Sequence, residues 1–159
     1  MFLLGAPCAG KSTLVPPLRE ALDFPVLDMD DELVRLTGGT WPALDVKRDL
    51  TNQVLAEASG LDAVLVAHSY LDDEQLVSLR EAEWVIGLLD LPEHVMRSRA
   101  VERLARDGWS NVEWLPWHLR NIEQLHAQQA FSYVFDATLP TSTLALVVAD
   151  IMSSGISRR

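Results

Sequence analysis

The residues best suited to chemistry lie near the start of the chain, in the segment Gly5-Ala6-Pro7-Cys8-Ala9-Gly10-Lys11-Ser12. This segment fits the pattern G-x-x-x-x-G-K-[ST] at every specified position, directly after an apolar run and directly before a helical pattern. The two glycines allow a tight turn, and we expect the N–H groups from Ala9 to Thr13 to point into a concavity at a helix N-terminus. Such a concavity binds phosphate oxygens. The alternative is a glycine-rich turn with an exposed lysine.

The side chains of this loop would complete a site for a nucleoside triphosphate. Lys11 would reach the β- and γ-phosphates as a positive point charge, and the Ser12 hydroxyl would be a ligand of Mg²⁺, which prefers oxygen. Cys8 lies near a helix N-terminus, but its position in the loop requires only the backbone, so we assign it no catalytic role. We predict that ATP, with Mg²⁺, is bound by Gly5, Ala6, Pro7, Cys8, Ala9, Gly10, Lys11, Ser12 and Thr13.

Short apolar runs alternate with helical patterns along the whole chain. The runs that predict strands are residues 2–4, 25–27, 63–67, 84–89 and 133–135. The helical patterns cover residues 11–22, 30–37, 45–59, 72–83, 92–107, 116–129 and 141–152. This alternation implies right-handed crossovers and a parallel sheet covered by helices on both faces. We therefore expect an α/β fold with a five-stranded parallel sheet between two helical layers, in one domain that spans residues 1–159.

The composition excludes several classes of protein. The chain has 159 residues and a formal net charge of −10, which argues against broad contact with nucleic acid or with an anionic membrane surface. No apolar run reaches the roughly 18 residues of a membrane-spanning helix, and the N-terminus has no secretory leader. The single Cys8 cannot form an internal disulfide. We expect a cytoplasmic monomer whose partner is a small molecule.

The loop and the alternating pattern resemble the small P-loop kinases related to shikimate kinase, gluconate kinase and adenylate kinase. Asp28-Met29-Asp30, directly after the second strand, is similar to the D-x-D of the shikimate kinase relatives. The resemblance implies the strand order 2-3-1-4-5, an Mg²⁺ shell supported by Asp28, and contact between Asp30 and the hydroxyl that receives phosphate. On an extended segment these two carboxylates would point the same way. The alternative is that Asp30 or Asp31 caps the following helix.

Five of the thirteen basic residues are gathered between positions 97 and 120: Arg97, Arg99, Arg103, Arg106 and Arg120. Similar kinases have such arginines at the edges of a mobile lid, which here would span residues 107–118 with Gly108 as its hinge. We predict that Arg103 and Arg120 act in catalysis by neutralising phosphoryl charge, and that Arg106 contacts the nucleotide. The alternative is a solvated helix face paired with Glu102 or nearby acids.

Four further features complete the predicted site. Pro140, after the last strand, resembles a proline that packs on adenine. Arg48 belongs to a partial match to the F-R-x-x-E of shikimate kinase relatives, and it would hold an acidic substrate. His68 lies where many P-loop proteins have an acidic residue, and it either contacts substrate or is structural. Trp109, Trp114 and Trp117 either stack on a ligand or anchor the lid.

The sequence departs from the shikimate kinase pattern after the third strand, where Ala67-His68-Ser69-Tyr70 replaces a glycine cluster. Gluconate kinase signatures are also absent, so the phosphoryl acceptor is not identified. We predict an ATP-dependent kinase, a phosphotransferase that moves the γ-phosphoryl group to a hydroxyl or phosphate of a small molecule. The alternative is a nucleotide-binding ATPase or regulatory module without a dedicated acceptor.

Overall fold

Five parallel strands form the centre of the molecule, which is described by a computed structural model that covers residues 1–108, 110 and 112–156. The strands are β1 (Phe2–Leu4), β2 (Val26–Asp28), β3 (Leu65–His68), β4 (Ile86–Asp90) and β5 (Tyr133–Asp136). Their order in the sheet is β2-β3-β1-β4-β5, and every neighbouring pair is parallel. The α/β class and the strand order 2-3-1-4-5 are therefore confirmed.

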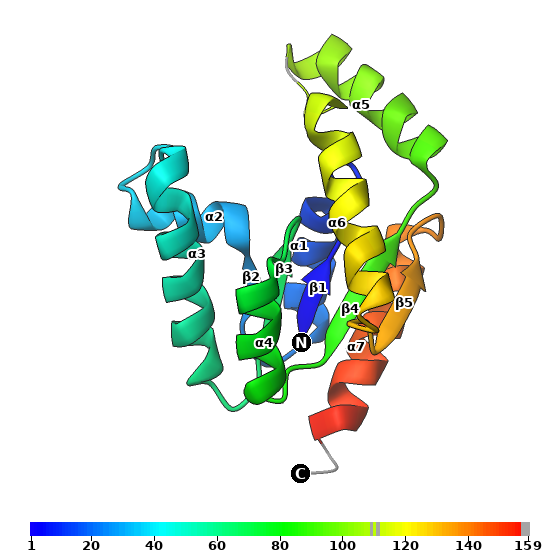
Figure 1. Cartoon of the computed structure of the whole chain (residues 1–159). Coiled ribbons are helices and arrows are strands. Elements are labelled where there is room, and N and C mark those ends of the chain that lie inside the picture. The colour runs from blue at the N-terminus through cyan, green and yellow to red at the C-terminus, as the bar shows by residue number, and fades with distance from the viewer. Residues whose placement is uncertain (109, 111, 157–159) are drawn as a thin grey trace.

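Helices cover both faces of this sheet (Figure 1). They are α1 (Lys11–Ala21), α2 (Met29–Leu36), α3 (Leu44–Ser59), α4 (Asp73–Glu81), α5 (Glu93–Asp107), α6 (Leu115–Ala127) and α7 (Thr141–Ile156), with a 3₁₀ turn at Val112–Trp114. Helices α1 and α7 pack together behind the sheet, whereas α3, α4 and α6 lie on its front face (Figure 1). No helix in the described part of the chain is both long and apolar enough to cross a bilayer.

The alternation of side chains along β1 explains why both faces must be covered. Leu3 joins the core beneath α1 and α7, and Phe2 and Leu4 join the core beneath α3 and α4. All three side chains are buried. Because successive residues of a strand point to opposite faces, a strand in which every residue is apolar is stable only between two helical layers.

The segment after β2 differs from the extended conformation expected for Asp28 and Asp30. Asp28 is the last residue of β2 and the N-cap of α2, and its Oδ1 accepts a hydrogen bond of 3.0 Å from the N–H of Asp30. Asp30 already lies in the first turn of α2. The expectation of an extended pair was therefore wrong, and so was the choice of Asp30 or Asp31 as cap. The first N–H groups of a helix have no partner within it, and a carboxylate at the N-cap supplies one.

Candidate active site

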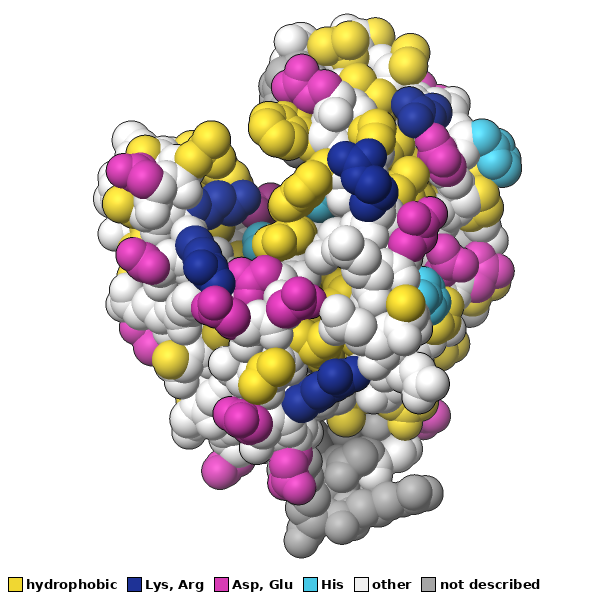
Figure 2. Space-filling model, viewed as in Figure 1, with side chains coloured by type: hydrophobic (Ala, Val, Ile, Leu, Met, Phe, Trp, Pro, Cys, Tyr) yellow, Lys and Arg dark blue, Asp and Glu magenta, His cyan; other side chains and the backbone are white. Residues whose placement is uncertain are grey.

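A cleft of about 1280 Å³ lies at the carboxyl ends of the strands. Figure 2 shows it as the hollow between the α2–α3 side of the molecule and the α5–α6 side. Its walls come from the loop after β1, the start of α2, the start of α3, the segment after β3, and parts of α5, α6 and α7. Open α/β sheets bind ligands at this edge, so the cleft is the candidate active site.

The loop from Gly5 to Gly10, which we call the P-loop, connects β1 to α1 with an uncapped helix N-terminus. Gly10 is the N-cap residue of α1 at φ 98°, a left-handed conformation, and no side chain caps the helix. A Cβ on Gly5 would lie 3.2 Å from the Cβ atoms of both Ala9 and Leu89, which is tighter than almost all real contacts. Glycine at these two positions therefore allows the backbone itself to form the wall of the cleft.

Fewer N–H groups are available for phosphate than the sequence predicted. The N–H of Ala9 donates to the carbonyl of Ala6, and the N–H of Thr13 donates to the carbonyl of Gly10. The N–H groups of Lys11 and Ser12, in the first turn of α1, have no hydrogen-bond partner among the described residues. Both residues line the cleft. The phosphate cradle is thus centred on the first turn of α1.

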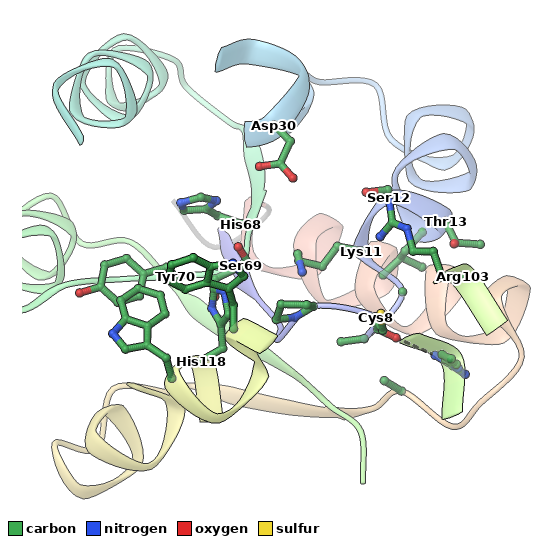
Figure 3. Close-up of a pocket in the computed structure, with 18 of the residues that line it drawn as sticks. Cys8, Lys11, Ser12, Thr13, Asp30, His68, Ser69, Tyr70, Arg103 and His118 are labelled. Atoms are coloured by element: carbon green, nitrogen blue, oxygen red, sulfur yellow. Dashed lines mark hydrogen bonds between the residues drawn. The ribbon is translucent and has the colours of Figure 1, made fainter. Parts of the chain in front are cut away.

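Lys11 lies at the centre of the cleft, between the P-loop and α2 (Figure 3). Its Nζ donates hydrogen bonds to the carbonyls of Gly5, at 2.6 Å, and Ala6, at 3.1 Å. Burial lowers the pKa of Lys11 to about 8, against the opposing effects of Asp30 and Asp28. A bound phosphate would therefore have to replace the two carbonyls as hydrogen-bond acceptors of Nζ. Its negative charge would then stabilise the desolvated ammonium of Lys11.

Asp30 and Ser12 both line the cleft, and in Figure 3 the Asp30 side chain extends into the space that Lys11 and Ser12 face. Burial, followed by the charge of Asp28, raises the pKa of Asp30. Asp28 itself is buried and is not among the lining residues. Ser12 and Asp30 offer the hard oxygens that Mg²⁺ prefers, so the donor set fits this ion; no group of three or more metal-binding side chains occurs in the described chain. Mg²⁺ bound by few protein ligands relies on substrate phosphates.

The arginines of α5 lie along the wall of the cleft that is opposite Asp30 and the start of α2 (Figure 1). Arg99 donates to the carbonyl of Cys8 at 3.3 Å, so this side chain contacts the P-loop directly. Arg103 and Arg106 also line the cleft, and both pair with Asp107, at 3.7 Å and 2.8 Å respectively. These three arginines, which share one face of α5, are therefore directed at the cleft, and Asp107 is the acidic partner of two of them. Sequence reasoning undervalued Arg99, although its i, i+4, i+7 spacing with the other two was visible.

Gly5, Ala6 and Asp28 are buried and do not line the cleft, and two further predicted residues also lie outside its walls. Arg120 is exposed on α6 and does not line the cleft, and Pro140 is exposed after β5, where Leu139 and Thr141 line the cleft instead. Their predicted roles remain untested predictions.

The predicted lid begins where α5 ends. Gly108 terminates that helix at φ 75°, which is the usual C-cap conformation of a glycine. Trp109 and Asn111, at the centre of the predicted lid, lie outside the described residues. Trp114 and Trp117, the other two tryptophans of the cluster, both line the cleft.

The start of α3 supplies two basic side chains with different surroundings. Arg48, predicted to hold an acidic substrate, lines the cleft, but its Nε lies 3.1 Å from a carboxylate oxygen of Asp72 and its second nitrogen 2.7 Å from Glu74. These two carboxylates raise the pKa of Arg48. Lys47, which sequence reasoning missed, lies 4.8 Å from the ring centre of Trp41 and also lines the cleft. The guanidinium is therefore already paired, whereas Lys47 makes a cation–π contact.

The position of His68 in the site is set by the register of the sheet. It pairs with Leu4, so it lies beside the first residue of the P-loop, and its carbonyl accepts a hydrogen bond of 3.2 Å from Gly5. The ring lines the cleft, but it is 4% exposed, and its buried Nδ1 has no hydrogen-bond partner in the described chain. Burial lowers the pKa of His68 to about 3. This imidazole is therefore neutral at physiological pH.

Three aromatic side chains join the segment after β3 to α6. Tyr70 and Trp117 are stacked, with ring centres 4.3 Å apart and an interplanar angle of 22°. Nδ1 of His118 donates to the carbonyl of Ser69 at 2.8 Å, and burial lowers the pKa of His118 to about 4. Sequence reasoning missed Tyr70 and His118 as site residues. The only signal was that Ala67-His68-Ser69-Tyr70 departed from the expected glycine cluster.

Comparison with known proteins gives structural neighbours but no sequence relative. No protein-family model matches the chain, and no curated protein sequence does. A shikimate kinase from Bacteroides thetaiotaomicron is 16% identical and has a TM-score of 0.71, over 96% of this chain and 97% of the other. A shikimate kinase from Acinetobacter baumannii, solved with shikimate, is 23% identical with a TM-score of 0.71, over 97% and 93%.

A gluconokinase from Sinorhizobium meliloti is similar over 98% of this chain and 94% of its own, with 20% identity and a TM-score of 0.65. At these identities the likeness establishes the fold. The chain has the fold of the small P-loop kinases that include shikimate kinase and gluconokinase, which confirms, for the fold, the resemblance found in the sequence.

Proposed function

We propose that this protein is a small-molecule kinase, which transfers the γ-phosphoryl group of ATP to a hydroxyl of a small acceptor. One observation carries the proposal: the unpaired N–H groups at the start of α1, the ammonium of Lys11 and the carboxylate of Asp30 all face one cleft. The first two features suit a polyphosphate, and the third suits an acceptor that must lose a proton. The fold of shikimate kinase and gluconokinase supports the same reaction class.

In the proposed reaction the acceptor oxygen attacks the γ-phosphorus while the bond from that phosphorus to the β–γ bridging oxygen breaks. ADP leaves with the electron pair of this bond, and the hydroxyl proton passes to the carboxylate of Asp30. The raised pKa of Asp30 suits this role, because a carboxylate in a desolvated site binds a proton more readily than one in water. Lys11 and Arg103 neutralise charge on the transferred group.

Mg²⁺ would be held by the hydroxyl of Ser12 and, through water, by the Asp28 carboxylate, and it would supply charge neutralisation between the β- and γ-phosphates. Arg106 and Arg120 would approach the nucleotide when the segment of residues 107–118 closes over it. Pro140 would pack near the base. Each of these assignments is part of the proposal.

The proposal is tested by measuring ADP release from ATP and Mg²⁺ with and without acceptors, and by identifying the phosphorylated product by ³¹P NMR. We expect turnover that depends on the acceptor and disappears in Lys11→Ala. Slow hydrolysis that no acceptor accelerates would instead support a nucleotide-binding regulator. Failure of the folded protein to bind any purine triphosphate with Mg²⁺ would exclude both functions.

A further inference from the structure

One side of the cleft is formed by the start of α2, the segment before α3, the start of α3, the end of β3 with the segment after it, and α6. It is called the acceptor side, and its residues are Asp30, Trp41, Lys47, Arg48, His68, Tyr70, Trp117 and His118. We infer that the acceptor side selects an uncharged alcohol that carries a flat ring, in preference to a carboxylate or a phosphate ester. The inference rests on the proposed kinase function and names the class of its acceptor.

The charges around Arg48 disfavour an acidic acceptor. An arginine binds a carboxylate through its planar fork, but Nε of this fork already pairs with Asp72 at 3.1 Å and one terminal nitrogen with Glu74 at 2.7 Å. One guanidinium between two carboxylates leaves a local charge of about −1 at neutral pH. A carboxylate or phosphate ester that approached Arg48 would therefore meet net repulsion.

The two remaining charges, Lys47 and Asp30, have opposite signs and offset each other, so the net negative charge beside Arg48 is left. Among the described residues of the acceptor side, Lys47 is the only other cation, and it lies over the ring of Trp41. Asp30, on the same side, has the opposite charge and would repel an acidic acceptor as it approaches. An uncharged acceptor avoids repulsion both by Asp30 and by the carboxylates beside Arg48.

The aromatic side chains favour a flat ring. Trp41 and Trp117 both line the cleft, although they are 51% and 41% exposed. Large exposed aromatic surfaces in a concave wall mark a place where a ligand gains free energy by covering them. Trp117 is held by its stack with Tyr70, so little side-chain freedom would be lost when a ring packs on it.

The two imidazoles supply polar contacts without charge. His118 donates its Nδ1 hydrogen to Ser69, which leaves Nε2 as an acceptor, and His68 has a buried Nδ1 without a partner in the described chain. Burial keeps both rings neutral, with pKa values of about 4 and 3. Neutral imidazoles can bind a hydroxyl or a ring heteroatom, but they add nothing to the attraction of an anion.

The size of the cleft allows a second ring besides the nucleotide. Its volume of about 1280 Å³ exceeds the roughly 300–1,000 Å³ of a pocket for one drug-sized ligand. Nucleosides and aromatic alcohols share the required chemistry, since each carries a hydroxyl beside a flat, uncharged ring. Neutral hexoses carry hydroxyls without a flat ring, and they serve as the comparison that isolates the effect of the ring.

The test measures kcat/KM with ATP and Mg²⁺ for uridine, adenosine, 4-nitrobenzyl alcohol, glucose, shikimate and gluconate. We expect at least one nucleoside or the aromatic alcohol to exceed both acids and glucose by about tenfold or more, equivalent to about 1.4 kcal/mol. Trp117→Ala should raise the KM of that acceptor about tenfold while the KM of ATP changes less than twofold. Trp117→Phe keeps a ring and should restore most of the loss.

Trp84→Phe is the matched control, because Trp84 lies outside the cleft and its indole N–H donates to Ser59 at 3.1 Å. It should change neither KM. A preference for shikimate, gluconate or glucose would overturn the inference, and so would an unchanged acceptor KM in Trp117→Ala. The test is completed by measuring the binding of the six compounds to wild-type protein and to Trp117→Phe, with quenching of tryptophan fluorescence as the readout.

These measurements separate the two proposals. If the ring compounds bind but none is phosphorylated, the kinase function fails and the ring-selective wall remains. If ATP is bound and some acceptor is phosphorylated but the ring compounds neither bind nor react, the kinase function remains and the inference is overturned. If no ring compound binds and no acceptor reacts, the inference is also overturned.

Discussion

The two sides of the cleft present different kinds of chemical groups to a ligand. The nucleotide side, which comprises the P-loop, the first turn of α1 and Arg99, Arg103 and Arg106 of α5, combines backbone N–H groups with four cationic side chains when Lys11 is included. The acceptor side combines half-exposed aromatic rings with neutral imidazoles and a guanidinium already paired with carboxylates.

This difference teaches that a short segment can encode the groups suited to a polyanion, whereas a wall suited to a neutral ring needs several segments that are far apart in the sequence. A helix N-terminus presents adjacent N–H groups because of its own geometry. A ring-binding wall requires faces from separate segments, here the segment before α3, the segment after β3, and α6. Substitutions on the two sides should therefore have separable effects.

Lys11→Ala should have the largest effect, since it removes the central charge of the nucleotide side. We expect phosphoryl transfer to fall about 10³-fold, as when an essential group that stabilises the transition state is lost. Steady-state kinetics and calorimetric titration with ATP and Mg²⁺ check this. Lys47→Ala, the same change on the acceptor side, should leave ATP affinity within about twofold. Equal losses of ATP affinity in the two variants would show that the sides are not separable.

Asp30→Asn should separate chemistry from nucleotide binding. We expect kcat to fall by about 10²-fold, because the amide cannot accept the hydroxyl proton, while ATP affinity changes little. Asp31→Asn is the matched control, because Asp31 is exposed and its nearest cation is Arg19 at 3.8 Å. A parallel loss of kcat and ATP affinity in Asp30→Asn would contradict the acceptor role.

The pH dependence of ATP binding should depend on the ionisation of Lys11, which belongs to the nucleotide side of the cleft. Burial lowers the pKa of Lys11 to about 8, and bound phosphates would raise the pKa again by pairing with the ammonium. Binding should then take up a proton above pH 8, so ATP affinity should fall by up to about tenfold for each pH unit above 8.

Calorimetry in two buffers with different ionisation enthalpies measures this proton uptake directly. The uptake should be absent in Lys11→Ala. An ATP affinity that stays constant between pH 7 and pH 9.5 would show that Lys11 does not titrate in this range. The acceptor side, with both imidazoles neutral, should contribute no change in acceptor binding over the same range.

Arg99→Ala should have a smaller effect than Lys11→Ala or Asp30→Asn. It removes the hydrogen bond that holds the Cys8 carbonyl of the P-loop against α5, so the KM of ATP should rise by up to about tenfold, equivalent to about 1.4 kcal/mol. The acceptor KM should not change. Arg97→Ala, two residues earlier on α5, removes only a surface pair with Glu93 and should leave both KM values unaltered.

The sequence was sufficient for the features that depend on adjacent residues. The P-loop pattern, the five strands and the helices between them were predicted within a few residues, because apolar periodicity and glycine positions act locally. The strand order came from the family resemblance and is confirmed. The partner of Arg99 could not be predicted, because Cys8 lies 91 residues away in sequence.

The electrostatic state of each side chain was decided by distant contacts. Arg48 looked available for an acidic substrate, but residues 24 and 26 positions later occupy it. Asp28 looked like half of an extended carboxylate pair, but the first turn of α2 uses its side chain as a cap. Both outcomes depend on where neighbouring elements place their charges and N–H groups, and no local pattern records that.

The amino-acid sequence alone determined that a glycine-rich turn with the P-loop pattern joins the first strand to the first helix, since helix geometry and glycine freedom require only neighbouring residues. The tertiary structure alone decided that Trp117 stacks on Tyr70, that His68 is neutral and that Arg48 is paired. Stacking, desolvation and charge pairing depend on distances between residues that are far apart in the chain, and only packing of the helices on the sheet fixes those distances.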